Sequence, residues 1–162
     1  MVKKAEHTDF ISLFKEELFI PHLKARTKEE VLVEMAELFL IQKKVKDKEI
    51  LLEMLHQRES LGSTGIGKGI AIPHSRSLLV NKLEVAIGRS VKGVSFDTID
   101  KKPAHLFFLI IAPPQDPGNQ YLVTLGRVAL ISQNLARNKQ YLEPKTPQEM
   151  IQLIRDAEDK IR

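Results

Sequence analysis

The stretch from Arg58 to Ser75 brings together residue types that could carry out chemistry on an anion. Four of the eight glycines lie in it, at positions 62, 65, 67 and 69. Such a cluster is typical of backbone with positive φ, or of a loop that another group approaches closely. The run 70–72 predicts a short strand, which Pro73 ends because proline lacks a donor for the ladder. His74 follows at the strand end, so the stretch predicts one imidazole, a nucleophile or base, held beside a loop with free N–H groups.

A nucleotide-binding loop is the first alternative for these glycines. Residues 62–68 fit the spacing G-x-x-x-x-G-K, but Gly69 stands where a serine or threonine would bind magnesium. A P-loop also follows a strand and precedes a helix. Here a helical pattern over residues 50–57 comes first and the strand pattern follows, so the order is inverted and we disfavour nucleotide binding.

Arg58 is the second candidate for anion chemistry. It closes a predicted helix at the entrance to the glycine loop. Its guanidinium could fold over the loop and neutralise a phosphate, because its planar fork of donors matches that geometry. It could equally be an exposed arginine at a helix end, and its spacing alone does not decide between the two.

The other four histidines have weaker functional settings. His7 and His22 are expected at the surface, His56 in the last turn of a helix where a cation suits the dipole, and His105 as a packing residue at a strand end. No histidine pair has the spacing H-x-x-x-H, and the chain has no cysteine. We therefore expect no metal, no disulfide and no thiol chemistry.

Length and composition predict one globular domain in a reducing, aqueous compartment. The 162 residues are 43% apolar and 28% charged, with a net charge of +4. The lysines at 43, 44, 46 and 48 lack interleaved aromatic residues, so a solvated turn is favoured over nucleic-acid binding. No signal peptide and no membrane-spanning run are visible, and we predict a cytoplasmic protein without membrane insertion. Residues 1–9 are expected to be a disordered lead-in to a domain over 10–162.

The elements that must position His74 alternate between helical and strand patterns. We predict helices over 10–18, from the capping box at Thr27, after Asp47, over about 119–135, and from the capping box at Thr146. The helix over 119–135 should turn Leu122, Leu125, Val128 and Ala129 inward, and the one after Asp47 should bury Ile50, Leu51, Met54 and Leu55.

Strands are expected at 18–20, at 83–88 with one buried face, and at 106–111 with both faces buried. Helices that alternate with strands, one of them fully covered, predict an α/β class. The fold should be a single-domain sandwich in which helices flank a mixed sheet.

The runs 58–67 and 69–74 resemble the enzyme IIA domain of the bacterial phosphotransferase system, of the fructose/mannitol type and nearest its nitrogen-regulatory branch. The resemblance covers roughly residues 10–158. It implies an α/β sandwich in which His74 accepts a phosphoryl group from the phosphohistidine of the carrier HPr or of its nitrogen-branch paralogue. Arg58 matches the active-site arginine of that family.

The residue types suit phosphoryl transfer. The transition state is loose, with charge on the equatorial oxygens, so the protein mainly positions and neutralises. A neutral imidazole supplies the nucleophile. N–H groups around Gly62, Ser63 and Thr64, together with Arg58, could hold the oxygens. No cofactor is required, because the donor already carries a phosphohistidine.

One position departs from the family pattern. The helix after the strand that ends at Ala112-Pro113 usually begins with a second histidine in a pattern like His-Leu-x-x-Leu, and here that run is Tyr121-Leu122-Val123-Thr124-Leu125. A tyrosine hydroxyl can donate one hydrogen bond to phosphate, but it carries no positive charge. The rate of transfer and the stability of the phospho-form therefore stay open.

Three functions are compatible with these observations. The first is a phosphocarrier-type regulatory protein whose phosphorylation state partner proteins read. The second is a binding module without efficient transfer, as Tyr121 could indicate. The third is a sugar-specific enzyme IIA that passes phosphate to a separate permease subunit. The chain shows no transporter segment or fused domain, which favours regulation.

Overall fold

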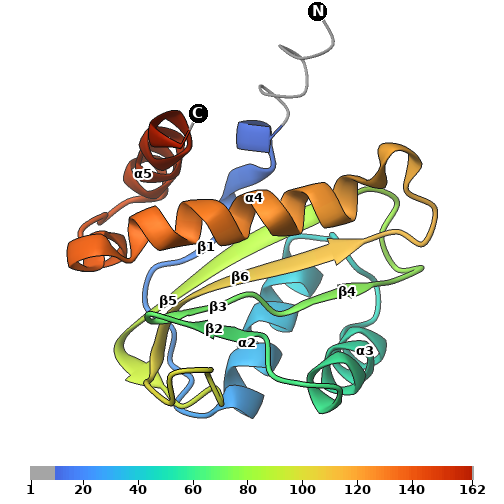
Figure 1. Cartoon of the computed structure of the whole chain (residues 1–162). Helices are drawn as coiled ribbons and strands as arrows, with labels where there is room; N and C mark the ends of the chain where they lie inside the picture. Colours follow the sequence, from blue (N-terminus) through green and yellow to red (C-terminus); the bar gives the residue numbers. More distant parts are fainter. Residues whose placement is uncertain (1–9, 162) are drawn as a thin grey trace, which may run out of the picture.

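The computed structural model describes residues 10–161, and the lead-in expected over residues 1–9 lies outside them. One six-stranded mixed sheet forms the middle of the fold (Figure 1). Its strands are β1 (Phe14–Ile20), β2 (Gly65–Gly67), β3 (Ile70–Ala71), β4 (His74–Arg76), β5 (Glu84–Val94) and β6 (Ala104–Ala112). The order is β1-β5-β6-β3-β2, and β4 also pairs with β6. Strands β5 and β6 are antiparallel, as are β2 and β3. Strand β1 pairs in parallel with β5, and β3 and β4 each pair in parallel with β6.

Helices lie on both faces of this sheet, with α2 and α3 on one side and α4 and α5 on the other (Figure 1). Their bounds are α2 (Lys28–Ile41), α3 (Lys48–Ser60), α4 (Gln120–Leu135) and α5 (Pro147–Lys160), with short 3₁₀ turns η1 (Pro117–Asn119) and η2 (Arg137–Leu142). The predicted α/β sandwich with a mixed sheet is thus confirmed.

The predicted helix starts are also confirmed at the N-cap residues. The side chains of Thr27, Asp47 and Thr146 each accept a hydrogen bond, at 3.1 Å, from the N–H three residues later. The two capping boxes differ from the usual pattern in one detail. Their glutamates bond the N–H of the residue before the N-cap, Arg26 in one case and Lys145 in the other.

Strand β6 separates the two cores, because its successive side chains point to opposite faces. Leu106, Phe108 and Ile110 pack with α4 and α5, whereas Phe107, Leu109 and Ile111 pack with α2 and α3. The prediction that both faces of this strand are buried is correct. The strand predicted at 83–88 was expected to bury only one face, and this was wrong. It forms part of β5, which is buried continuously from Glu84 to Ser90 between the same two helix layers.

Three local predictions failed because tertiary burial outweighed helical spacing. The helix expected over 10–18 ends after residue 12, and the chain continues as β1, which pairs with β5. In helix α4 the predicted face is confirmed at Val128, which is buried, and at Leu125 and Ala129, which pack partly buried against the core. Leu122 was wrongly predicted to face inward, because it is 56% exposed while Tyr121 and Thr124 are buried. Ile50 of α3, also predicted to face inward, is 47% exposed.

Arg89 on β5 gives a test of what holds the sandwich together. Its side chain is only 3% exposed and donates to the backbone carbonyls of Pro21, Tyr141 and Pro144. Burial lowers the pKa of this guanidinium. Arg89→Met would leave those carbonyls unpaired, at about 1–3 kcal/mol each where no water replaces the donor. We expect the free energy of unfolding, measured by urea denaturation, to fall by about 3 kcal/mol.

Arg155→Met is the matched control, because Arg155 is exposed on α5. We expect its free energy of unfolding to stay within about 0.5 kcal/mol of the wild type. An Arg89→Met variant as stable as this control would show that Arg89 is not a structural bridge between the strands and the segment after η2.

Candidate functional site

His74 lies at a break between two short strands. Strand β3 ends at Ala71, and His74 begins β4, where it pairs with Ile110 of β6. The prediction that His74 follows a strand end was right about β3, but it missed that pairing resumes. Pro73 has no N–H, yet its carbonyl accepts from the Ile110 N–H at 3.0 Å, so the chain stays on β6. The imidazole is thereby held between two anchored segments.

Both ring nitrogens of His74 have a partner within the site. Nδ1 is 2.6 Å from the carbonyl oxygen of Ile72, and Arg58 donates from Nε to Nε2 at 3.3 Å. A carbonyl only accepts and a guanidinium only donates, so the proton is on Nδ1 and the lone pair is on Nε2. The arrangement presents Nε2 as the nucleophilic atom.

The surroundings keep this imidazole neutral. Partial burial of the ring lowers the pKa of His74 below 6.5, and the nearby Arg58 charge lowers it further. The hydrogen bond to the Ile72 carbonyl and the charge of Glu59 oppose this shift. At neutral pH the ring is therefore unprotonated at Nε2. A neutral imidazole is the state in which histidine acts as a nucleophile.

Arg58 connects the glycine loop to His74. It lies in the last turn of α3, and its Nη1 donates to the carbonyl oxygen of Gly62 at 2.9 Å. Its Nε makes the contact with His74. The side chain is half-buried, so the alternative of an exposed helix-end arginine does not describe it. One guanidinium thus reaches both the glycine loop and the imidazole of His74.

The loop residues proposed to bind phosphoryl oxygens also have structural bonds of their own. Gly62 has φ +146° and donates its N–H to the Glu59 carbonyl at 3.1 Å. The Ser63 hydroxyl donates to the Phe96 carbonyl at 2.7 Å, and the Thr64 N–H donates to the Glu59 carboxylate at 3.1 Å. Their role as phosphoryl ligands stays a prediction.

Glu59 is a contributor that sequence reasoning left without a role. Its side chain is 7% exposed and bonds Lys28 Nζ at 2.9 Å as well as the N–H and hydroxyl of Thr64. The carboxylate therefore ties α2 to the glycine loop, next to the residue that contacts His74. Its position directly after Arg58 in the sequence could have indicated that it contributes to the site.

Tyr121 lies beside His74, with the ring centroids 6.0 Å apart and the planes tilted by 59°. Asp116 holds this end of α4 by accepting from the N–H groups of Gln120 at 3.0 Å and Tyr121 at 2.8 Å. Burial raises the pKa of Tyr121, although Arg76 and Arg58 oppose the shift. The hydroxyl therefore keeps its proton and can donate a hydrogen bond.

Arg76 brings a second positive charge to the site, and sequence reasoning missed it. It is two residues after His74 on β4, so both side chains leave the same face of the strand. Its guanidinium carbon is 4.6 Å from the centre of the Tyr121 ring, and Nη1 donates to the Pro113 carbonyl at 3.1 Å. The i, i+2 spacing from His74 was the signal that could have identified it.

Two findings concern other kinds of site. Within residues 10–161, no cluster of three or more His, Asp or Glu side chains is placed to hold a metal ion. In the same part of the chain, none of the helices combines the length and the apolar composition that a bilayer crossing needs.

Comparison with known proteins identifies the class to which this fold and site belong. The profile of the family described as "Phosphoenolpyruvate-dependent sugar phosphotransferase system, EIIA 2" matches residues 12–157. The chain belongs to this family, as the resemblance in the Arg58–His74 region predicted.

Relatives occur in both the sugar and the nitrogen branches. The chain is 35% identical over 133 residues to the PTS system fructose-specific EIIABC component of Bacillus subtilis, covering 82% of this chain but only 21% of that protein. It is 32% identical over 123 residues to a nitrogen regulatory protein of Bradyrhizobium diazoefficiens, covering 75% and 79%. The crystal structure of Nitrogen Regulatory Protein IIA-Ntr from Neisseria meningitidis superposes with a TM-score of 0.79 at 25% identity, covering 89% and 97%.

Proposed function

We propose that this protein is a phosphoryl carrier that accepts a phosphoryl group on Nε2 of His74. The observation that carries this proposal is the pair of contacts to the ring, from Nδ1 to the Ile72 carbonyl and from Arg58 to Nε2. In the transfer, a bond forms between Nε2 and phosphorus while the bond from phosphorus to the donor's imidazole nitrogen breaks. The electron pair of the broken bond stays on the donor ring, and Nδ1 of His74 keeps its proton.

Arg58 has a different partner before and after this step. In the unphosphorylated protein its Nε–H faces the lone pair that must attack, at 3.3 Å. An incoming phosphoryl group displaces that contact and gives the guanidinium donors oxygen atoms to bind. Charge develops on those oxygens in the transition state, so this stabilisation acts where it accelerates transfer. Arg76 supplies the charge that Tyr121 lacks.

The surface around His74 suits a protein donor. Leu61, which follows the last turn of α3, is 85% exposed, and Leu78, two residues after Arg76, is 87% exposed. Leu122, next to Tyr121, is 56% exposed. Large apolar side chains grouped beside a reactive group are typical of a protein-docking surface.

We propose HPr or its nitrogen-branch paralogue as the donor, and a regulatory protein that reads the state of His74 as the downstream partner. Because phosphoenolpyruvate is a cytoplasmic metabolite, we also propose that transfer occurs there. The fructose-specific relative favours a second candidate, in which phosphate passes to a separate permease subunit. Arg76 argues against a module without transfer, since the site keeps Arg58 against the imidazole and a second arginine against the neighbouring Tyr121 ring.

Incubation with labelled phosphoenolpyruvate and the general phosphotransferase proteins of each branch tests this function. We expect label on one histidine, faster with one HPr-type carrier than with the other. A chain that stays unlabelled with both carriers would contradict the phosphocarrier proposal. Genome neighbours that encode a permease or a nitrogen regulator would separate the two downstream roles.

Tyr121 allows a test of the position that departs from the family pattern. If its hydroxyl donates to the phosphoryl group, Tyr121→Phe should slow transfer by about two- to thirteenfold, which corresponds to a hydrogen bond of roughly 0.5–1.5 kcal/mol. Tyr121→His should speed transfer or lengthen the lifetime of the phospho-form, and more so at lower pH, where the imidazole is charged. Quenched time courses of phosphorylation and of dephosphorylation measure the rate of transfer and the lifetime of the phospho-form.

Tyr141→Phe is the matched control, because Tyr141 is the only other tyrosine and lies on η2 against His105. We expect its transfer rate to equal that of the wild type. If the Phe and His variants at position 121 also transfer at the wild-type rate, Tyr121 only fills space and the site works through His74 and the arginines.

A further inference from the structure

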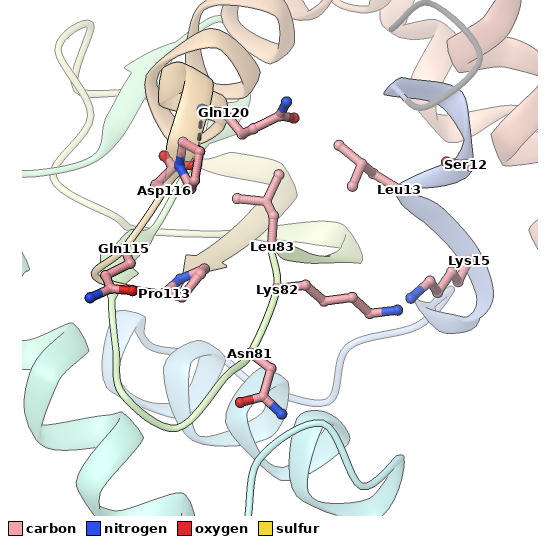
Figure 2. A pocket seen from close by; sticks show the side chains of 11 residues that line it. Ser12, Leu13, Lys15, Asn81, Lys82, Leu83, Pro113, Gln115, Asp116 and Gln120 are labelled. Carbon is pink, nitrogen blue, oxygen red and sulfur yellow. Dashed lines mark hydrogen bonds between the residues drawn. The ribbon is translucent and has the colours of Figure 1, made fainter. Parts of the chain in front are cut away.

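A cavity lies at the end of the sheet where β6 finishes and where β1 and β5 begin (Figure 2). Its volume is about 480 Å³, which is within the range of about 300–1,000 Å³ typical of small-molecule sites. The residues used below are Leu13, Lys15, Lys82, Leu83, Asp116 and Gln120, all in its lining. Asp116 also supports Tyr121 and Arg76 at the transfer site, whereas the other five residues have no role in the transfer proposed for His74.

The charges around this cavity favour an anion. The ammonium groups of Lys15 and Lys82 point toward one another across its mouth (Figure 2). Lys15 Nζ is already paired with Glu84 Oε1 at 3.3 Å, whereas no carboxylate in residues 10–161 forms an ion pair with Lys82. Asp116, the carboxylate in the wall, accepts from two N–H groups of α4. Lys82 is therefore the cation in this cavity that lacks a counter-charge.

The remaining lining adds an apolar part and neutral donors. Leu83 is 9% exposed and Leu13 is half-buried, so both form an apolar wall, while the amide of Gln120 lies at the rim. A ligand that satisfies all of these groups has one anionic head and a short apolar body. We propose that this cavity binds a small organic anion, a carboxylate or a phosphate ester, and that its occupancy slows phosphoryl transfer at His74.

The wall of the cavity is also the support of the transfer site. Asp116 accepts from the Tyr121 N–H at 2.8 Å and lies 3.6 Å from Arg76 Nη1, and Arg76 donates to the Pro113 carbonyl. An anion bound at Lys82 repels the Asp116 carboxylate toward Arg76 and strengthens that ion pair. Arg76 is then less available to a phosphoryl group, and the added negative charge opposes its arrival. Both effects slow transfer. The proposed slowing, unlike the proposed binding, rests on the function proposed above for His74.

Binding is tested on the full chain by following backbone amide signals in ¹H–¹⁵N spectra during titration. The probes are benzoate and phenyl phosphate, which combine an anionic group with an apolar ring. Inorganic phosphate supplies the anionic group alone, and benzyl alcohol supplies the apolar ring without a charge. We expect saturable shifts with the first two probes at residues 12–15, 81–84 and 115–121, together with the Arg76 signal, because Asp116 bonds Tyr121 and pairs with Arg76. Lys82→Gln should weaken them at least about fivefold, whereas Lys46→Gln, an equal charge change at an exposed site, should not.

Shifts that do not saturate, that scatter over the surface, or that are equal in the Lys82→Gln variant would overturn the binding site. This readout does not involve phosphorylation, so it stands even if His74 proves not to be the acceptor.

Coupling is tested by the rate of His74 phosphorylation with and without saturating benzoate. We expect a slowing of about fivefold or more in the wild type and in Lys46→Gln. Lys82→Gln should keep the basal rate and lose the response, which also controls for any action of the probe on the donor proteins. Binding without a change in rate, or an equal slowing in Lys82→Gln, would overturn the coupling.

Discussion

His74→Ala is expected to abolish phosphorylation of this protein while leaving its fold intact. The substitution removes the lone pair on Nε2, the atom that we propose forms the bond to phosphorus. The half-exposed side chain lies at the edge of the sheet, and the pairing of β4 with β6 uses backbone groups only. Its structural cost is two hydrogen bonds, one to the Ile72 carbonyl and one from Arg58, together about 1–3 kcal/mol.

Labelling with phosphoenolpyruvate measures this loss, and urea denaturation measures the stability of the variant. His22→Ala is the control, because His22 is exposed and distant in sequence from β4. Undiminished labelling of His74→Ala would end the proposal that His74 is the acceptor.

The lowered pKa of His74 adds a pH dependence with a definite sign. Transfer needs the neutral ring, so the rate should fall as the pH drops, with the midpoint of the fall below pH 6.5. The unfolded chain binds this proton more readily, so the wild type should also lose stability below pH 6.5. His74→Ala should lack that share of the loss. A transfer rate that already falls by half at pH 7 would contradict a lowered pKa.

Arg58→Ala is expected to slow phosphorylation by about two to three orders of magnitude without changing which residue is modified. Electrostatic donors aimed at charge that develops in a transition state are often worth this much. In the unphosphorylated protein the same guanidinium bonds His74 and the Gly62 carbonyl, so its loss also loosens the entry to the glycine loop. Single-turnover transfer from the phosphorylated carrier measures the effect.

Two further variants separate charge from geometry at this position. Arg58→Lys keeps the charge but not the planar fork, so its rate should fall between those of the wild type and the alanine variant. Arg155→Ala removes an exposed arginine from α5 and should have no effect. Because Arg58 lowers the pKa of His74, its removal should also move the fall in rate to higher pH. A wild-type rate for Arg58→Ala would reduce Arg58 to a helix-end residue.

Several features of this protein were determined by short stretches of sequence. The N-caps at Thr27, Asp47 and Thr146 were predictable because a capping side chain bonds an N–H only three residues away. The burial of β6 on both faces followed from its unbroken apolar run. The spacing of Arg58 did not decide its role, and its place beside His74 was expected only from the resemblance of the run that contains both residues to the family.

The remaining features were decided by contacts between distant segments. Residues 14–17 were predicted as helix but form the start of β1, because the edge of the sheet offers pairing with β5, whereas the strand predicted at 18–20 is the end of β1. The face of α4 is set by packing on the sheet, which places Tyr121 beside His74 and leaves Leu122 exposed. Arg76, Asp116 and Lys82 belong to different local patterns, and only the end of the sheet brings them together. A local pattern reports the geometry of one element, whereas the neighbours of a side chain depend on how the layers pack.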